Sequence, residues 1–315
     1  MGMNVPDRNA GFARGQAQVW GFGKDTAIDS MSYGPPGAKI FYVDRNNAQA
    51  VDFGNLGEDP TVPLATVAAA VALCRSHYGD TIILAGNDAW QYAPHNRPLP
   101  IAESLVIPAT KGGIRIVGAS TNPFGVQWQA GADNEACITI HAIDVLIEGI
   151  AFVQPVPLAG TTGITGVWGG ANFGENFTVR RCYFVGLDYG ITTDYSWYCQ
   201  IYSNYFNHID VAAILNLTIM AREADFETIH DNTFLDCALA ISLPNVEGNF
   251  IYNNRIFGAH GGALNFINTT GGGGNLVSDN WLSCTMAEYA TTCGDGGTDV
   301  WCRNHCSDGE TVGNP

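Results

Sequence analysis

Ile201-Tyr202-Ser203-Asn204-Tyr205-Phe206 is one copy of a six-residue phrase that decides the fold. The phrase has an aliphatic residue first, Asn or Cys fourth, and an aromatic or aliphatic residue sixth. It occurs five times in succession, beginning at Val179, Ile201, Ile229, Ile251 and Val277. The fourth residues are separated by 22, 28, 22 and 26 positions, and a repeat of this length is typical of a solenoid.

Each phrase continues into a second half with its own pattern. A small or apolar residue comes three positions after the sixth residue, a small one three positions later, and an apolar one within the next two. In the first copy these are Leu187, Gly190 and Ile191. One coil is therefore predicted to carry two short strands joined by a turn, together with a loop of variable length.

Stacking of such coils predicts an all-β protein, a parallel β-helix over residues 111–283. A single coil cannot bury its apolar side, but coils stacked at the ~4.8 Å strand spacing form one continuous core. Equivalent residues then lie above one another. The predicted core column contains Phe184, Phe206, Phe234 and Ile256. The predicted ladder of inward-facing asparagine amides contains Asn204, Asn232, Asn254 and Asn280.

The flanking segments suggest how the solenoid is closed. Residues 39–110 are expected to hold a strand at 40–44, a capping helix at 63–74 and the first coils. The stretch 79–84 is expected to form the first strand of the solenoid. The helix follows from the spacing of Val67, Ala70, Val71 and Cys74. Residues 1–38 lack periodicity and are interpreted as an extended arm, and residues 284–315 as a cysteine-containing C-terminal cap.

Charge and hydropathy exclude two classes of partner. The chain has 30 acidic and 14 basic residues in 315, for a formal net charge of −16. Such a surface repels phosphate backbones and anionic bilayers, so neither a nucleic acid nor a membrane is expected as a partner. No apolar run approaches the length of a signal or a membrane span, and synthesis in the cytoplasm is expected.

Residues 41–84 carry a resemblance to a known superfamily. Tyr42-Val43-Asp44, the stretch Pro63–Thr66 and Gly79-Asp80 follow one another as they do at the opening of right-handed parallel β-helix (pectate-lyase-like) proteins. The ending, from Thr298 to Gly309, is similar to β-helix proteins of tailed-phage virions. The resemblance implies a homotrimer that decorates a phage head or forms a tailspike. It does not imply an activity, because the superfamily includes lyases, hydrolases and inert scaffolds.

A hydrolytic site is the main alternative. Glycoside hydrolysis requires two carboxyl groups roughly 5–9.5 Å apart. Counting four residues past the sixth residue of each phrase gives Asp188, Asp210, Ala238 and His260 in successive coils. Asp188 and Asp210 would then stack on neighbouring coils with His260 beyond them. The competing interpretation is a surface column of turn residues, where Asp is common in any case.

The nine cysteines suggest no firm metal site. Zinc ligands usually come in pairs two to four residues apart, and only Cys302 and Cys306 have that spacing. Disulfides or plain thiols are favoured over zinc, and no cofactor is expected.

These observations favour a non-enzymatic structural protein of a phage-like virion, either a capsid decoration protein or a short spike. The expected partners are two further copies of the chain, a major capsid or other virion protein, and a host-surface glycan. The alternatives are a tailspike-type glycan hydrolase that uses Asp188 and Asp210, and a glycan-binding adhesin.

Overall fold

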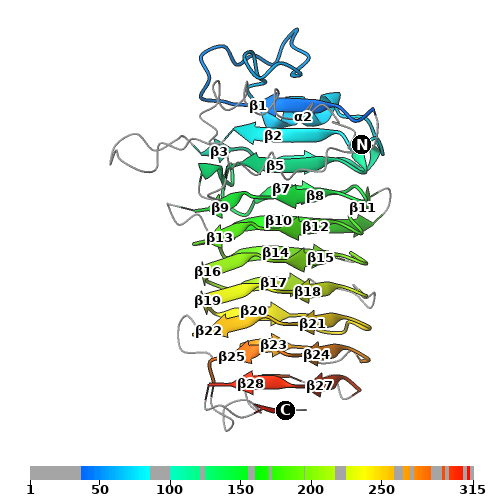
Figure 1. The fold of residues 1–315 in the computed structure, drawn as a ribbon, viewed down its shortest axis with the longest axis vertical. Coiled ribbons are helices and arrows are strands. Elements are labelled where there is room, and N and C mark those ends of the chain that lie inside the picture. The colour runs from blue at the N-terminus through cyan, green and yellow to red at the C-terminus, as the bar shows by residue number, and fades with distance from the viewer. Residues whose placement is uncertain are drawn as a thin grey trace, which may run out of the picture.

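In the computed structural model the chain is a right-handed parallel β-helix, as the repeats predict (Figure 1). The structure describes residues 37–85, 100–120, 125–154, 160–169, 172–194, 196–216, 225–258, 265–269, 273–284, 293–294, 298–307 and 311–312. Most of the predicted arm at 1–38 lies outside these residues, and so does His260. Among the described helices none is long and apolar enough to cross a membrane.

Three long sheets run along the molecule, and each full coil contributes one strand to each sheet. Sheet A contains β1 (Ile40–Val43), β2 (Thr81–Ala85), β5 (Arg115–Ala119), β8 (Leu146–Glu148), β12 (Thr178–Arg180), β15 (Gln200–Tyr202), β18 (Thr228–His230), β21 (Phe250–Tyr252), β24 (Leu276–Ser278) and β27 (Val300–Cys302). Sheet B contains β3 (Ile101–Ala102), β6 (Gln127–Gln129), β9 (Ala151–Val153), β13 (Tyr183–Val185), β16 (Tyr205–Ile209), β19 (Thr233–Cys237), β22 (Arg255–Phe257), β25 (Trp281–Leu282), β28 (Asn304–Cys306) and β29 (Thr311–Val312). Sheet C contains β4 (Leu105–Ile107), β7 (Ala136–Ile140), β10 (Thr162–Gly169), β14 (Tyr189–Asp194), β17 (Ala212–Asn216), β20 (Leu239–Ser242), β23 (Asn265–Asn268) and β26 (Cys293–Gly294), with β11 (Asn172–Phe173) antiparallel to β10.

The coil is built differently from the sequence prediction in one respect. The six-residue phrase already spans two strands, as β15 and β16 show, and its second half forms a third strand in sheet C. The expected count of two strands per coil is therefore wrong. The turn at the fourth residue of the phrase separates the first two strands, so the strands are shorter and more numerous than the pattern suggests.

The predicted boundaries of the solenoid are also too narrow. At the N-terminal end β1 pairs with β2 in parallel, so the stack begins at residue 40 and 79–84 belongs to its second strand in sheet A. At the other end β26, β27 and β28 pair in parallel with β23, β24 and β25. Residues 284–315 thus continue the coil, and β29 then pairs with β28 in the antiparallel sense. In the last coil the buried apolar positions are occupied by Cys293, Trp301 and Cys306, so a search for Ile and Phe does not find it.

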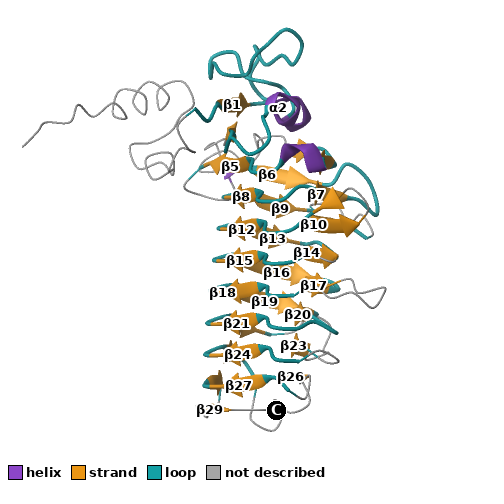
Figure 2. Cartoon of the chain, turned by 90° about the vertical axis from the view of Figure 1, so that its right-hand side faces the viewer, coloured by secondary structure: helices purple, strands orange, loops and turns teal. Residues whose placement is uncertain are grey.

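The capping helix is present but shorter than predicted. Helix α2 (Val67–Leu73) begins after Thr66, whose hydroxyl accepts a hydrogen bond from the Ala69 N–H. Pro63 to Thr66 precede the helix, because Leu64 is held by a bridge to Val43 of β1. Figure 2 shows α2 at the N-terminal end of the stack, where it buries Val67, Ala70 and Val71. A one-turn 3₁₀ helix at Ala109–Lys111 follows β4.

Aromatic rings stacked along the molecule fill the centre of the core. The ring centroids of Phe184 and Phe206 are 4.8 Å apart and those of Phe206 and Phe234 are 4.9 Å apart. Ile256 continues the column beyond Phe234, and all four side chains are at most 1% exposed. The small residue in the second half of the phrase makes room for these rings. A Cβ atom on Gly190 would lie 2.8 Å from the ring of Phe206.

The asparagine ladder lies at the turn between sheets A and B. The side-chain N–H₂ groups of Asn204, Asn232 and Asn254 each donate to the amide oxygen of the next asparagine at 3.0–3.1 Å. Asn280 continues the ladder to Asn304, one member beyond the predicted set. Each amide also donates to a main-chain carbonyl, as Asn232 does to that of Ile201 at 2.9 Å. The ladder therefore satisfies the polar groups that each turn buries.

Candidate functional site

Asp188 and Asp210 lie on neighbouring coils at the turn between sheets B and C, and their main chains are in register. Val185 pairs with Asn207, and the Asp210 N–H donates to the carbonyl of Leu187, the residue before Asp188. The carbonyl of Asp188 accepts hydrogen bonds from both Val211 and Ala212, and Ala212 pairs with Tyr189, so the one extra residue of the second coil is Val211. Because Val211 follows Asp210, the count of four residues past the sixth residue of the phrase does place the two aspartates opposite each other.

The two carboxylates have different partners. The Asp188 side chain accepts a hydrogen bond from the main-chain N–H of Gly160, on the preceding coil. The Asp210 side chain is half exposed, with Oδ1 4.0 Å from Nε2 of His208. His208 in turn places Nδ1 3.2 Å from Oδ2 of Asp236, on the following coil. Asp188 therefore fastens a loop, whereas Asp210 belongs to a surface group of one histidine and two aspartates. Ala238 follows on the next coil with its N–H bonded to Ile209, and His260 lies outside the described residues.

The two cysteines with zinc-like spacing lie in different sheets. Cys302 ends β27 in sheet A and is partly exposed, whereas Cys306 ends β28 in sheet B and is buried. Cys306 instead faces Cys284, with the two sulfur atoms 3.6 Å apart. In the part of the chain that the structure describes, no three His, Cys, Asp or Glu side chains are grouped so as to hold a metal ion.

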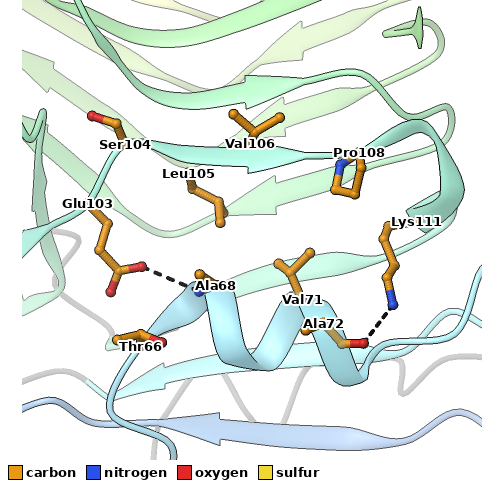
Figure 3. Close-up of a pocket in the computed structure, with 10 residues that line it drawn as sticks. All are labelled: Thr66, Ala68, Val71, Ala72, Glu103, Ser104, Leu105, Val106, Pro108 and Lys111. Carbon is orange, nitrogen blue, oxygen red and sulfur yellow. Dashed lines mark hydrogen bonds between the residues drawn. The ribbon is translucent and has the colours of Figure 1, made fainter. Parts of the chain in front are cut away.

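A groove of about 460 Å³ lies between α2 and β4 (Figure 3). Its middle is apolar and includes Val71, Leu105 and Val106, and a charged residue stands at each end. Glu103 accepts hydrogen bonds from the N–H groups of Val67 and Ala68 at the start of the helix. Burial raises the pKa of the Glu103 carboxyl, and these two N–H donors lower it.

Lys111 stands at the other end of the groove and donates to the carbonyls of Ala72 and Cys74 at 2.8 and 2.5 Å. Both charged residues of the groove thus bind the ends of α2, negative at the N-terminus and positive at the C-terminus. Their role is to hold the capping helix on the first coils.

The outer face of sheet A carries a column of stacked rings. The ring of His230 lies 4.8 Å from those of Tyr202 and Tyr252, at interplanar angles of 5° and 2°. Arg180 donates to the Tyr202 hydroxyl at 2.9 Å and pairs with Glu148 at 2.7 Å. Both faces of the His230 ring are covered by its neighbours, so this ring offers no open face on which a sugar could stack.

Sequence reasoning missed a second polar ladder, at the turn that enters sheet A. Asn249 donates its side-chain N–H to Asn275 at 2.9 Å, and Asn275 donates to Asp299 at 2.9 Å. Asp299 also accepts a hydrogen bond from the Thr269 hydroxyl at 2.6 Å. Asn249 and Asn275 each stand two positions before the first residue of a repeated phrase, and Asp299 stands two positions before Trp301. Extending the phrase two residues upstream would have included both asparagines.

Glu227 occupies the same ladder position one coil before Asn249, and its environment is unusual. Its main-chain N–H donates to the Asn249 side chain at 2.7 Å. Its carboxyl is fully buried, and among the described residues neither carboxyl oxygen has a hydrogen-bond partner of ordinary geometry. The pKa of the Glu227 carboxyl is raised to about 8, chiefly by burial, while the nearby Thr193 hydroxyl lowers it and the charge of Asp225 raises it by smaller amounts. The Cys199 thiol, one coil earlier, has a pKa raised by burial and then by the charge of Glu227.

Comparisons with known proteins show a similarity in backbone structure alone. No protein-family model matches the sequence, and no curated protein matches it. Among solved structures, that of rice weevil pectin methyl esterase is similar with a TM-score of 0.43 and 9% sequence identity. The alignment covers 80% of this chain and 81% of that chain. The three parallel sheets themselves define the class of protein, a parallel β-helix.

Proposed function

We propose that the chain is a non-enzymatic structural protein of a phage-like particle, a capsid decoration protein or a short spike. The observation that carries the proposal is the unbroken register of the three sheets from Ile40 to Cys306, around one core and beside two buried polar ladders. Each coil is bonded to the next through main chain and side chains alike, so the molecule forms a stiff rod. The phage-like setting is supported by the resemblance of the C-terminal sequence to virion β-helix proteins.

The rod suits a post that projects from a particle. Its formal charge of −16 keeps an abundant surface protein soluble and disfavours binding to nucleic acid and to membranes. The proposed partners are a major capsid or other virion protein at the attached end and a host glycan at the free surface. Asp188 supports the structural role, since its carboxylate holds the main chain of Gly160.

The structural proposal and the catalytic alternative predict different outcomes for the two aspartates, and the following results are expected from the structural proposal. Wild-type protein should release no reducing ends from acidic or neutral polysaccharides. The double substitution Asp188→Asn, Asp210→Asn should leave its association with particles unchanged. The reason is that the two carboxylates have different partners: Asp188 accepts the Gly160 N–H, whereas Asp210 lies beside His208 on the surface. Circular dichroism should first show that the variant is folded, and a known polysaccharide hydrolase should serve as the positive control. Release of reducing ends by the wild type, abolished in the double variant, would replace the structural proposal with the enzymatic one.

The oligomeric state is the second testable part of the proposal. We expect a symmetric assembly of three chains, because closed cyclic assemblies are the rule for soluble homo-oligomers and the resemblance to virion proteins favours threefold symmetry. Light scattering coupled to size-exclusion chromatography should give the mass of three chains. A stable dimer would contradict this expectation, since two copies related by a twofold axis cannot form a threefold spike.

A further inference from the structure

Unpaired polar atoms concentrate at one corner of the β-helix, between sheet C and sheet A. Within the part of the chain that the structure describes, six buried side-chain atoms at this corner have no hydrogen-bond partner. They are the Thr193 hydroxyl, the Ser196 hydroxyl, both amide atoms of Asn216 and both carboxyl oxygens of Glu227. These four residues are each at most 2% exposed. Buried polar groups are nearly always paired, so such a group calls for an explanation.

Thr193 is the neighbour of both Asn216 and Glu227, and Ser196 lies beside Gly166, the residue that pairs with Thr193 on the preceding coil. Thr193 of β14 pairs with Asn216 of β17, and Thr193 also pairs with Gly166 of β10. The Ser196 hydroxyl oxygen lies 2.6 Å from the position that a Cβ atom on Gly166 would occupy. The Thr193 hydroxyl is close enough to the Glu227 carboxyl to affect its ionisation, although no hydrogen bond of ordinary geometry joins them. The oxygens thus come from three successive coils.

The equivalent corner further along the rod shows what a completed arrangement looks like. There Thr269, one residue after β23, donates to the Asp299 carboxylate at 2.6 Å. The other Asp299 oxygen accepts from the main chain and the side chain of Asn275 at 3.0 and 2.9 Å. Thr269 directly follows its strand of sheet C, and Asp299 precedes the second strand of sheet A that follows along the chain, β27. Thr193 of β14 and Glu227, which precedes β18, are related in the same way. One corner is therefore closed by protein groups alone, whereas the corner of Glu227 is not.

We propose that the corner of Glu227 binds one dehydrated monovalent cation such as Na⁺. The Glu227 carboxylate, the hydroxyls of Thr193 and Ser196 and the amide oxygen of Asn216 are hard oxygen donors, the ligand type that hard cations prefer. A single charge is favoured because Glu227 is the one fully buried carboxylate at this corner, and a buried charge must be balanced. The nearby Asp225 carboxylate, which accepts the N–H of Glu247, adds negative potential. This proposal is independent of the proposed structural function.

Cation and proton compete for the same carboxyl group in this arrangement. At low pH Glu227 is protonated and the site is neutral, so internal water can form hydrogen bonds with its oxygen atoms. As the pH rises through the range in which Glu227 ionises, the cation replaces the proton and fastens β14, β17 and the entry to β18 to one another. Binding should therefore stabilise the folded protein only where Glu227 is ionised.

Thermal unfolding at constant ionic strength tests the proposal. At about pH 9 the wild-type midpoint should be about 2–4 °C higher in sodium chloride than in tetramethylammonium chloride, whose cation is too large to enter. At about pH 5 the two salts should give the same midpoint, because the proton occupies the site. Glu227→Gln should show no difference between the salts at either pH. Asp299→Asn is the matched control: it removes a buried carboxylate from the same ladder and should retain the sodium effect.

Equal midpoints of the wild type in both salts at about pH 9 would overturn the proposal. A sodium effect that persists in Glu227→Gln would also overturn it, since it would then arise from the acidic surface. If Glu227→Gln does not fold, the wild-type comparison alone decides: a sodium effect of the same size at about pH 5 would exclude the Glu227 carboxylate as the ligand.

Discussion

Replacement of Phe234 by alanine should lower the free energy of unfolding by about 3–5 kcal/mol, the range measured for large cavities in packed cores. The Phe234 ring is fully buried, stacks on Phe206 at 4.9 Å and is followed by Ile256 in the next coil. Its removal would interrupt the column at its middle, where two rigid coils cannot collapse into the space. Chemical denaturation monitored by circular dichroism measures the change.

Leu235 provides the matched control for that substitution. It is the next residue of β19, points to the outer face and is 39% exposed. Leu235→Ala should therefore change the free energy of unfolding by less than about 1 kcal/mol. A loss below about 1 kcal/mol for Phe234→Ala as well would show that the aromatic column does not support the core.

The stability of the wild-type protein should fall as the pH rises from about 4.5 to about 8, through the ionisation of Glu227. The pKa of this carboxyl is about 8 in the folded protein, raised chiefly by burial, against an ordinary value of 4.5. The unfolded chain therefore releases this proton first, and rising pH favours the unfolded state until both states are ionised. The separation of the two values corresponds to roughly 5 kcal/mol, present as stability below the lower pKa and lost above the higher one.

Glu227→Gln isolates this contribution, because other carboxyl groups titrate alike in both proteins. The difference in unfolding free energy between variant and wild type should move in favour of the variant as the pH rises, when both are measured without sodium. Urea denaturation at a series of pH values in tetramethylammonium buffers provides the measurement. Parallel pH profiles for the two proteins would mean that Glu227 ionises equally well in the folded and unfolded states.

The repeated phrase predicts the register of sheets A and B because its residues face the interior at fixed positions. The spacing of 22 between Asn232 and Asn254 in the sequence is the spacing of the residues that pair across β18 and β21. The division of the phrase into two strands escaped prediction for a physical reason. The turn at its fourth residue is only two residues long, and the buried asparagine there faces the interior as the apolar residues on either side of it do, so the six residues show no break. The second half of the phrase, predicted as a strand, forms sheet C.

The candidate sites could be predicted less well than the core. The ladder at Asn204 can be predicted because its members are chemically identical, whereas the second ladder mixes glutamate, asparagine and aspartate, in Glu227, Asn249, Asn275 and Asp299. Spacing places Asp210 opposite Asp188, but it cannot locate the extra residue Val211 in the following turn, which shifts the pairing of β17 with β14 by one residue. Side-chain partners such as the Gly160 N–H come from distant loops, so no local pattern announces them.

The two ends of the rod determine whether copies can polymerise end to end. At each end of a parallel β-helix the outermost strands present unpaired main-chain N–H and C=O groups. A second copy could pair with these edges and extend the molecule into a fibre. At the N-terminal end the free edge of β1 is already occupied, since Tyr42 exchanges hydrogen bonds with Gly57 and Leu64. At the C-terminal end β29 runs antiparallel along β28 and so reverses the hydrogen-bonding pattern that another parallel coil would need. Addition of another copy end to end is thereby disfavoured at β1 and at the end of sheet B. Copies that associate side by side then form an assembly whose length is that of one rod.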